Sequence, residues 1–135
     1  MAVDEATLAD LTSPDRHRRK RAAERLASKP CADAVPLLIG LVADGHEDVR
    51  SSALVALARL PDPRGRDAAL DVLARDGEDE FVQRKALFVL EALADDLSRQ
   101  SLRETAAASP NSMLRHEAEL ILTRLDDMPP SSPAS

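Results

Sequence analysis

The sequence predicts an all-α protein, an α-solenoid of about four antiparallel helix pairs. Three observations support this prediction. Alanine and leucine, two of the strongest helix formers, dominate an apolar fraction of 44%, while aromatic residues make up 1%. A helical segment recurs four times along the chain at a nearly constant spacing. Ser-Pro and Asp-Gly pairs, which are typical of helix starts and helix ends, recur with the same spacing.

Four segments align with one another without gaps and define the repeat. They begin at Arg18, Val49, Val82 and Leu114, so their starts are 31, 33 and 32 residues apart. The fifth position is always alanine and the ninth is always leucine: Ala22, Ala53, Ala86 and Ala118, then Leu26, Leu57, Leu90 and Leu122. A spacing of four residues puts both positions on one helix face. Each segment is therefore predicted to be an inner helix with one buried stripe.

The stretches between these segments predict a second, outer set of helices over 3–12, 34–43, 64–75 and 95–108. Leu38 and Leu41 recur 32 residues later as Leu70 and Leu73, so the outer helices share the period. A single pair has an apolar face that it cannot bury alone, and successive pairs are expected to stack into a curved solenoid. We expect one repeat domain over residues 1–127, followed by a disordered tail at 128–135, where proline and serine predominate.

Residues 34–60 resemble a HEAT repeat of the short variety found in phycobilin-lyase-type and other bacterial proteins. The residues that carry the resemblance are Pro36 in the first helix, Asp44 between the helices, and Val49 with Arg50 at the start of the second helix. The resemblance implies a right-handed solenoid whose terminal pairs are more polar than the central ones. The first pair fits this expectation, because it retains little of the buried stripe.

The other repeats depart from this pattern at the charged positions. Arg19 and Arg115 keep the arginine, but the third repeat has Gln83 in its place. Asp76 keeps the aspartate in the third repeat, whereas serine replaces it in the outer repeats, at Ser13 and Ser109. A continuous Asp–Arg ladder along the stack is therefore not expected.

The sequence lacks the short motifs of phosphate-binding loops, dinucleotide sites, zinc proteases and paired cysteines. His17, His46 and His116 fall in different parts of the repeat, and their spacing predicts no metal site. The single cysteine, Cys31, is interpreted as a small, partly buried thiol. The resemblance leaves one alternative open, in which Cys31 attaches a ligand as in bilin chemistry. No catalytic residue, metal or cofactor is predicted.

Two further features bear on location. One cysteine excludes an intramolecular disulfide and suits a reducing compartment. The first residues are acidic where a secretory signal is basic and then apolar, and no window is long and apolar enough to span a membrane. We expect a cytoplasmic protein.

The net charge of −6 conceals a basic end. Residues 14–29 carry about +5, so the rest of the chain carries about −11. The basic patch comprises Arg16, Arg18, Arg19, Lys20, Arg21 and Arg25. The favoured interpretation is a solvated capping helix. An acidic protein partner and nucleic acid are the alternatives, and the absence of Trp and Tyr argues against a protein that stacks on bases.

The seventh position of the repeat is apolar in three neighbouring repeats. It is occupied by Glu24, Val55, Phe88 and Leu120, and cations lie nearby in the sequence: Arg59, Arg84, Lys85 and Arg124. These apolar side chains either fill gaps between adjacent helices or form an exposed row in a concave groove. An exposed row flanked by cations would suit an acidic or amphipathic helix or an extended peptide, with Phe88 as the anchor.

The sequence thus favours a non-catalytic scaffold or adaptor that binds a segment of another protein in its concave groove. Two alternatives remain open. One is a tetrapyrrole or bilin-lyase-like protein, or another enzyme-accessory protein, which the resemblance alone implies. The other is nucleic-acid binding through the basic first repeat.

Overall fold

The computed structural model describes residues 3–29 and 31–127, and the tail predicted at 128–135 lies outside this part. Within the described residues the chain forms eight helices and no strand. They are α1 (Glu5–Leu11), α2 (Arg16–Ser28), α3 (Ala34–Leu41), α4 (Glu47–Ala58), α5 (Pro63–Ala74), α6 (Glu80–Leu93), α7 (Asp96–Ala108) and α8 (Ser112–Asp127). The predicted pairing of helices and the all-α solenoid are confirmed.

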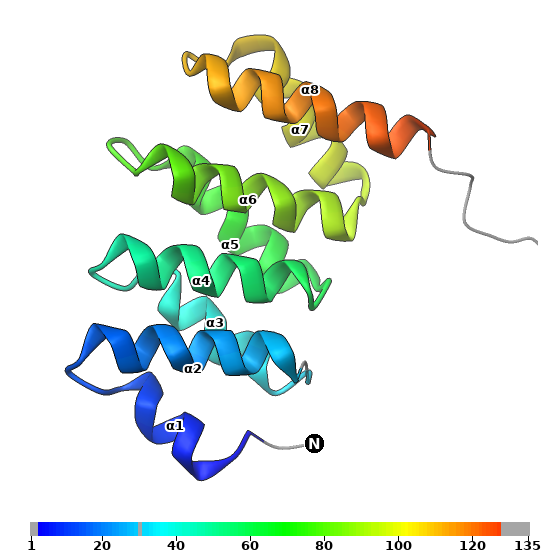
Figure 1. Cartoon of the computed structure of the whole chain (residues 1–135). Helices are drawn as coiled ribbons and strands as arrows, with labels where there is room; N and C mark the ends of the chain where they lie inside the picture. Colours follow the sequence, from blue (N-terminus) through cyan, green and yellow to red (C-terminus); the bar gives the residue numbers. More distant parts are fainter. Residues whose placement is uncertain (1–2, 30, 128–135) are drawn as a thin grey trace, which may run out of the picture.

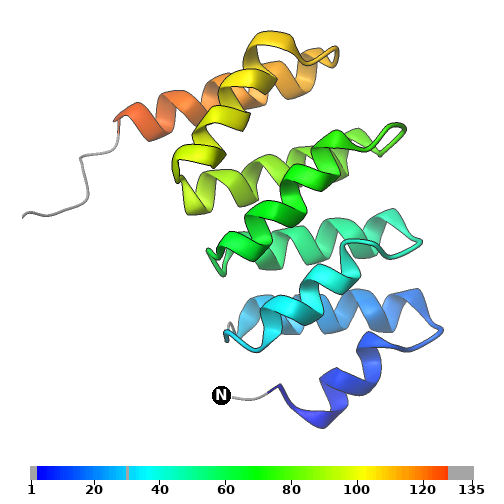
Figure 2. The ribbon, with the colours of Figure 1, turned by 180° about the vertical axis from the view of Figure 1, so that it is seen from behind.

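The helices form two layers (Figures 1 and 2). The inner helices α2, α4, α6 and α8 lie side by side along the stack, and each packs against the outer helix that precedes it, α1, α3, α5 or α7. Contact within the inner layer is much more extensive than contact within the outer layer. Because the inner helices are closer together, the stack curves toward them, and they line its concave face.

Aspartate side chains begin most of these helices. Asp4, Asp15, Asp62, Asp79 and Asp95 each accept a hydrogen bond from a backbone N–H in the first turn of the following helix. A short acceptor at this position satisfies a donor that the helix itself leaves unpaired. Asn111 does the same for α8 by accepting from the backbone N–H of Leu114.

Two turn predictions were wrong in detail. Ser13 and Ser109 do not cap helices; each hydroxyl accepts from the backbone N–H two residues later, in the turn before the true cap. Of the two Asp-Gly pairs, only the second has its glycine in the left-handed region, with φ 74° at Gly77. Gly45, in the connection between α3 and α4, does not have a positive φ.

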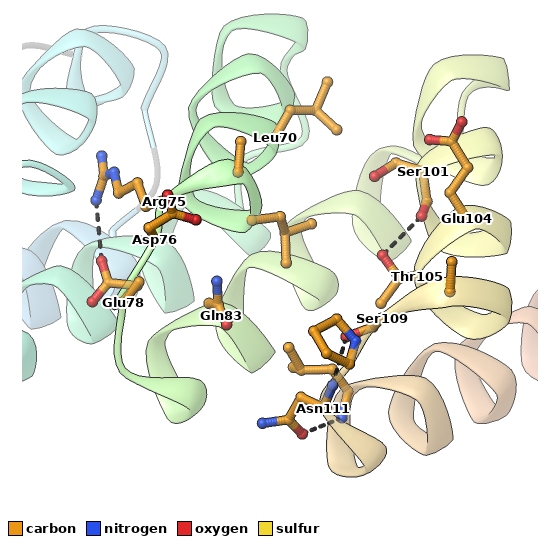
Figure 3. A pocket seen from close by; sticks show the side chains of 16 residues that line it. Leu70, Arg75, Asp76, Glu78, Gln83, Ser101, Glu104, Thr105, Ser109 and Asn111 are labelled. Atoms are coloured by element: carbon orange, nitrogen blue, oxygen red, sulfur yellow. Dashed lines mark hydrogen bonds and ion pairs between the residues drawn. The ribbon is translucent and has the colours of Figure 1, made fainter.

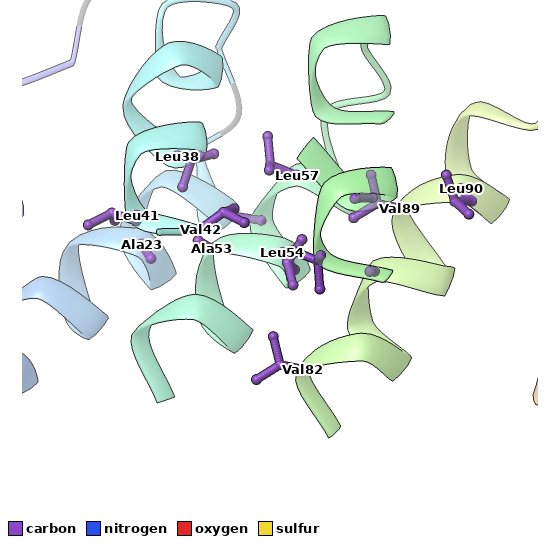
Figure 4. Packing of buried hydrophobic residues seen from close by; sticks show 14 of the residues in the cluster. Ala23, Leu38, Leu41, Val42, Ala53, Leu54, Leu57, Val82, Val89 and Leu90 are labelled. Atoms are coloured by element: carbon purple, nitrogen blue, oxygen red, sulfur yellow. The ribbon is translucent and has the colours of Figure 1, made fainter. Parts of the chain in front are cut away.

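The core lies between the two layers and between successive inner helices (Figure 4). The alanines of the fifth position are all buried, as are Leu26, Leu57 and Leu90 of the ninth. Leu122, the ninth-position residue of α8, is only partly buried, since no helix follows α8 in the described chain.

The sixth position of the repeat, which sequence comparison did not single out, packs consecutive inner helices together. Ala23, Leu54 and Leu87 are fully buried there, and Leu54 lies in the cluster shown in Figure 4. In α8 the same position is Glu119, which is exposed. The last described inner helix therefore has a charged residue at the position where the other inner helices pack on their neighbours, as expected for a terminal repeat.

Candidate functional site

The predicted apolar row is present on the concave face, with one residue on each of α4, α6 and α8. Val55 is 38% exposed and Leu120 is 43% exposed. Phe88 is only partly buried and packs against the core. The row therefore offers apolar surface to solvent, and Val55 and Leu120 contribute most of it.

A shallow depression of about 160 Å³ lies between α2 and α4 at one end of this row. It is lined by Glu24, Ser51, Ser52 and Val55, together with Ala27. The seventh position of the first repeat, Glu24, thus faces the same hollow as the third, fourth and seventh positions of the second repeat, Ser51, Ser52 and Val55.

Phe88 is held between two cations. The Arg84 guanidinium lies 5.7 Å from the centroid of the ring, and the Lys85 ammonium lies 5.6 Å from it. A cation over an aromatic face at this distance is attracted by the electron-rich ring. Phe88 therefore lies against the core and beside two cations, and it is less exposed than Val55 and Leu120.

Most arginines beside the row are already paired. Arg84 donates from Nε to Glu117 at 2.9 Å, and Arg124 donates to both oxygens of Glu91 at 2.9 and 3.1 Å. Glu117, at the fourth position of the last repeat, is buried, and its carboxylate lies between Arg84 and Arg124. Within the described residues, Arg59 and Lys85 have no carboxylate at ion-pair distance.

Some residues of the basic patch on α2 already form contacts within the protein. Arg19 pairs with Asp44 of the next repeat, Arg25 pairs with Asp10 of α1, and the Arg16 guanidinium contacts His46. In the part of the chain that the structure describes, no carboxylate pairs with the three other members, Arg18, Lys20 and Arg21. The patch is smaller than its sequence suggests.

The structure also locates the residues that were considered as chemical sites. Cys31 lies in the connection between α2 and α3 and is partly buried against the core. Over residues 3–29 and 31–127, no three His, Cys, Asp or Glu side chains gather closely enough to hold a metal ion. None of the helices described is both long and apolar enough to cross a bilayer.

A second candidate region is the set of interfaces between consecutive repeats. At the first interface, Arg19 donates two hydrogen bonds to the Asp44 carboxylate, from Nε at 2.7 Å and from Nη2 at 3.2 Å. Its Nη1 donates to the carbonyl of Ser13 in its own repeat at 2.8 Å. One guanidinium thus joins the turn of its own repeat to the turn of the next.

The second interface repeats this arrangement with a different acid. Arg50 donates from Nε and Nη2 to Glu78 at 3.1 and 2.7 Å, and from Nη1 to the carbonyl of Asp44 at 2.9 Å. Arg75 adds a third link, since its Nη1 donates to Glu78 at 3.2 Å and to the carbonyl of Val42 at 3.0 Å.

Asp76, predicted to take the acid position of the third repeat, is exposed instead. Asp44 lies five residues before Val49, whereas Asp76 lies six residues before Val82, so the turn before α6 has one more residue than the turn before α4. The longer turn contains Gly77. That extra residue places Glu78, not Asp76, opposite Arg50.

The environment of both acids favours their charged forms. Burial acts to raise the pKa of Asp44, but hydrogen bonds from Arg19 and from the His46 backbone outweigh it and hold the pKa below its ordinary value of 3.8. Burial likewise acts to raise the pKa of Glu78, and hydrogen bonds from Arg50 and the Asp79 backbone lower it below 4.5.

At the third interface, within the described residues, no arginine–carboxylate pair joins the two turns. Gln83 replaces the arginine, and its amide donates to the carbonyl of Val72 at 3.4 Å. Ser109 stands at the acid position, where its carbonyl accepts from Arg115 of the same repeat at 2.6 Å. A cleft of about 690 Å³ opens between α5 and α7 at this interface (Figure 3).

Comparison with known proteins agrees with this architecture. Residues 5–91, which span α1 to most of α6, match the family described as HEAT repeats. No curated protein matches the chain in sequence. HEAT repeats commonly serve as protein-interaction scaffolds and are generally non-catalytic. The match covers more than half of the chain but does not identify a subfamily, so the likeness to phycobilin-lyase-type proteins stays a prediction. From its repeat, its fold and this match, the chain belongs to the HEAT-repeat family.

Proposed function

We propose that the protein is a non-catalytic scaffold that binds a segment of another protein along its concave face. The observation that carries this proposal is the apolar row, in which Val55 and Leu120 are exposed on either side of the partly buried Phe88. The inner helices hold these side chains at equivalent positions in successive repeats. A face that presents apolar side chains at regular intervals suits a helix or an extended segment laid across it.

The charges beside the row indicate the chemistry of the partner. Lys85 and Arg59 are the cations near the row that have no carboxylate partner within the described residues, and Lys85 lies next to the Phe88 ring. An amphipathic segment with acidic side chains beside its apolar face would complement this arrangement. Arg84 and Arg124 are expected to contribute less to partner binding, because their charges are already balanced by Glu117 and Glu91.

The proposal can be tested by capture from native lysate followed by cross-linking. Immobilised wild-type protein is compared with a variant that carries Val55→Ser and Leu120→Ser, and cross-links to the captured partner are then mapped. The matched control carries Leu8→Ser and Leu97→Ser, because Leu8 and Leu97 are similarly exposed, at 42% and 52%, but lie on outer helices. The partner should be lost from the first variant alone. Cross-links confined to the outer helices, or equal capture by both variants, would refute the proposal.

A further inference from the structure

We propose that the cleft at the third inter-repeat interface is a second binding site, for a peptide segment in which an arginine or lysine is flanked by apolar residues. The cleft lies between the outer helices α5 and α7, whereas the apolar row lies on the inner helices (Figure 3). The two sites share no residue, and this inference does not depend on the proposed function.

The cleft is lined by both apolar and polar residues. Leu70 and Leu73 of α5 and Leu114 of α8 line it with apolar surface that is at least partly buried. The volume of about 690 Å³ is within the range of about 300–1,000 Å³ found for sites that enclose a small ligand or a few side chains.

The cleft exists because charged side chains that fill the second interface are missing at the third. The aspartates that cap α5 and α7, Asp62 and Asp95, are 33 residues apart, so Ala108 stands in α7 where Arg75 stands after α5. Gln83 replaces Arg50 in the same way, and Ser109, five residues before Leu114, occupies the position that Asp44 holds five residues before Val49. Shorter side chains therefore line the third interface at both places where the second has a guanidinium.

The loss of Arg75's counterpart leaves a carboxylate without its partner. At the second interface Arg75 donates to Asp71, four residues earlier in α5, at 3.1 Å. Glu104 is the residue of α7 that corresponds to Asp71, and it lines the cleft with Ala108 four residues after it. Within the described residues no cation lies at ion-pair distance from Glu104. A cationic side chain from outside would supply the charge that Ala108 does not.

The other groups around the cleft also favour a cation. Two carboxylates that line it, those of Asp76 and Glu104, have no cation at ion-pair distance within the described residues, whereas Glu78 and Arg75 pair with each other. The C-terminal end of α5 lies at its edge, and the carbonyl groups at a helix C-terminus carry partial negative charge. At the second interface Arg75 donates to the corresponding end of α3, at the carbonyl of Val42. The chain itself thus shows how a guanidinium is accommodated between two repeats.

The experiment is an NMR titration of the full chain with hexylguanidinium, which combines an apolar chain with the proposed cationic group. Its neutral isostere hexylurea serves as the comparison. We expect saturable shifts of amide signals from the cleft, including Leu73, Thr105 and Ala108, with binding of hexylurea at least about fivefold weaker, since a hydrogen bond to a charged group contributes more than a neutral one. Equal binding of both compounds, or shifts that lie elsewhere, would overturn the proposal.

Three variants make the test specific. Glu104→Gln should weaken hexylguanidinium binding several-fold, whereas the control Glu119→Gln, an exposed acid on α8 outside the cleft, should leave it unchanged. Ala108→Arg restores the missing guanidinium and should block binding without unfolding the protein, which the amide spectrum itself reports. Unchanged binding in both Glu104→Gln and Ala108→Arg would contradict the site. None of these results bears on the apolar row, so the scaffold proposal is judged separately.

Discussion

Arg50 holds Glu78 through two parallel hydrogen bonds across the second inter-repeat interface, although the two residues are 28 positions apart in the chain. Its Nη1 donates to the carbonyl of Asp44, in the turn of its own repeat. A planar guanidinium that joins two turns in this way fixes the offset between consecutive helix pairs. Arg19 does the same at the first interface, and Gln83 cannot do so at the third. An arginine–carboxylate pair therefore joins the turns at the first two interfaces but, within the described residues, not at the third.

Arg50→Met should lower the free energy of unfolding by about 1–3 kcal/mol, because it leaves the Glu78 carboxylate, only 3% exposed, without its main partner. The matched control is Gln83→Met at the equivalent position of the next repeat, which removes one long hydrogen bond and should change stability much less. Urea denaturation followed by circular dichroism measures both. Equal losses would show that the arginine does not tie the repeats.

Acid should destabilise the protein through the same contacts. The pKa values of Asp44 and Glu78 are lowered in the folded state, so the stability that they contribute is present above their ordinary values of 3.8 and 4.5 and is lost as the pH falls below them. A variant with Asp44→Asn and Glu78→Gln should be less stable than wild type at pH 7 and should lose less stability between pH 5 and pH 3. Urea unfolding across this range provides the comparison. Parallel curves for the two proteins would contradict the assignment.

The fourth repeat should open before the others. Within the described residues, no arginine–carboxylate pair joins the turns before α6 and α8, although Arg84–Glu117 and Arg124–Glu91 link the two helices themselves. The third interface also contains the large cleft and brings α6 and α8 into less extensive contact than α4 and α6. Hydrogen exchange measured by mass spectrometry should therefore show faster exchange in α7 and α8 than in α4 and α6, since local openings occur where the packing is weakest. Uniform protection from α4 to α8 would be inconsistent with an open interface.

The buried leucines of the ninth position should differ in importance along the stack. Leu57→Ala and Leu90→Ala should each cost about 2–5 kcal/mol, because both side chains are buried in the core. Leu122→Ala, at the same position of α8, should cost clearly less, because Leu122 is only partly buried. Thermal or urea unfolding of the three variants tests this order, and equal destabilisation would contradict the smaller burial of Leu122.

The helical repeat could be predicted from sequence because its signal is periodic. Alanine and leucine recur on one helix face, and the short helices leave little ambiguity about pairing. Helix caps were harder to place, since Ser13 and Asp15 are both good acceptors and only the path of the turn decides between them. The same holds for Asp76 and Glu78, where one extra residue in the turn changes which acid meets Arg50.

The groove was predictable only in outline. Its exposed positions follow from helical periodicity, and Val55 and Leu120 lie where the period places them. The burial of Glu117 did not follow, because it depends on Arg84 and Arg124, which reach it from two different helices. The cleft was also missed, although Gln83 and Ala108 stand in the sequence where the preceding repeat has arginines. Comparing charged positions between repeats would have revealed it.

The most direct test of the central claim is the affinity of the captured partner for defined variants, measured by isothermal titration calorimetry. If the apolar row binds the partner, Val55→Asp combined with Leu120→Asp should lower affinity by at least about 30-fold, or about 2 kcal/mol. The control pair Leu8→Asp and Leu97→Asp, exposed on the outer helices, should leave it within about twofold. An affinity that is unchanged by the first pair, or reduced equally by both, would contradict binding along the concave face.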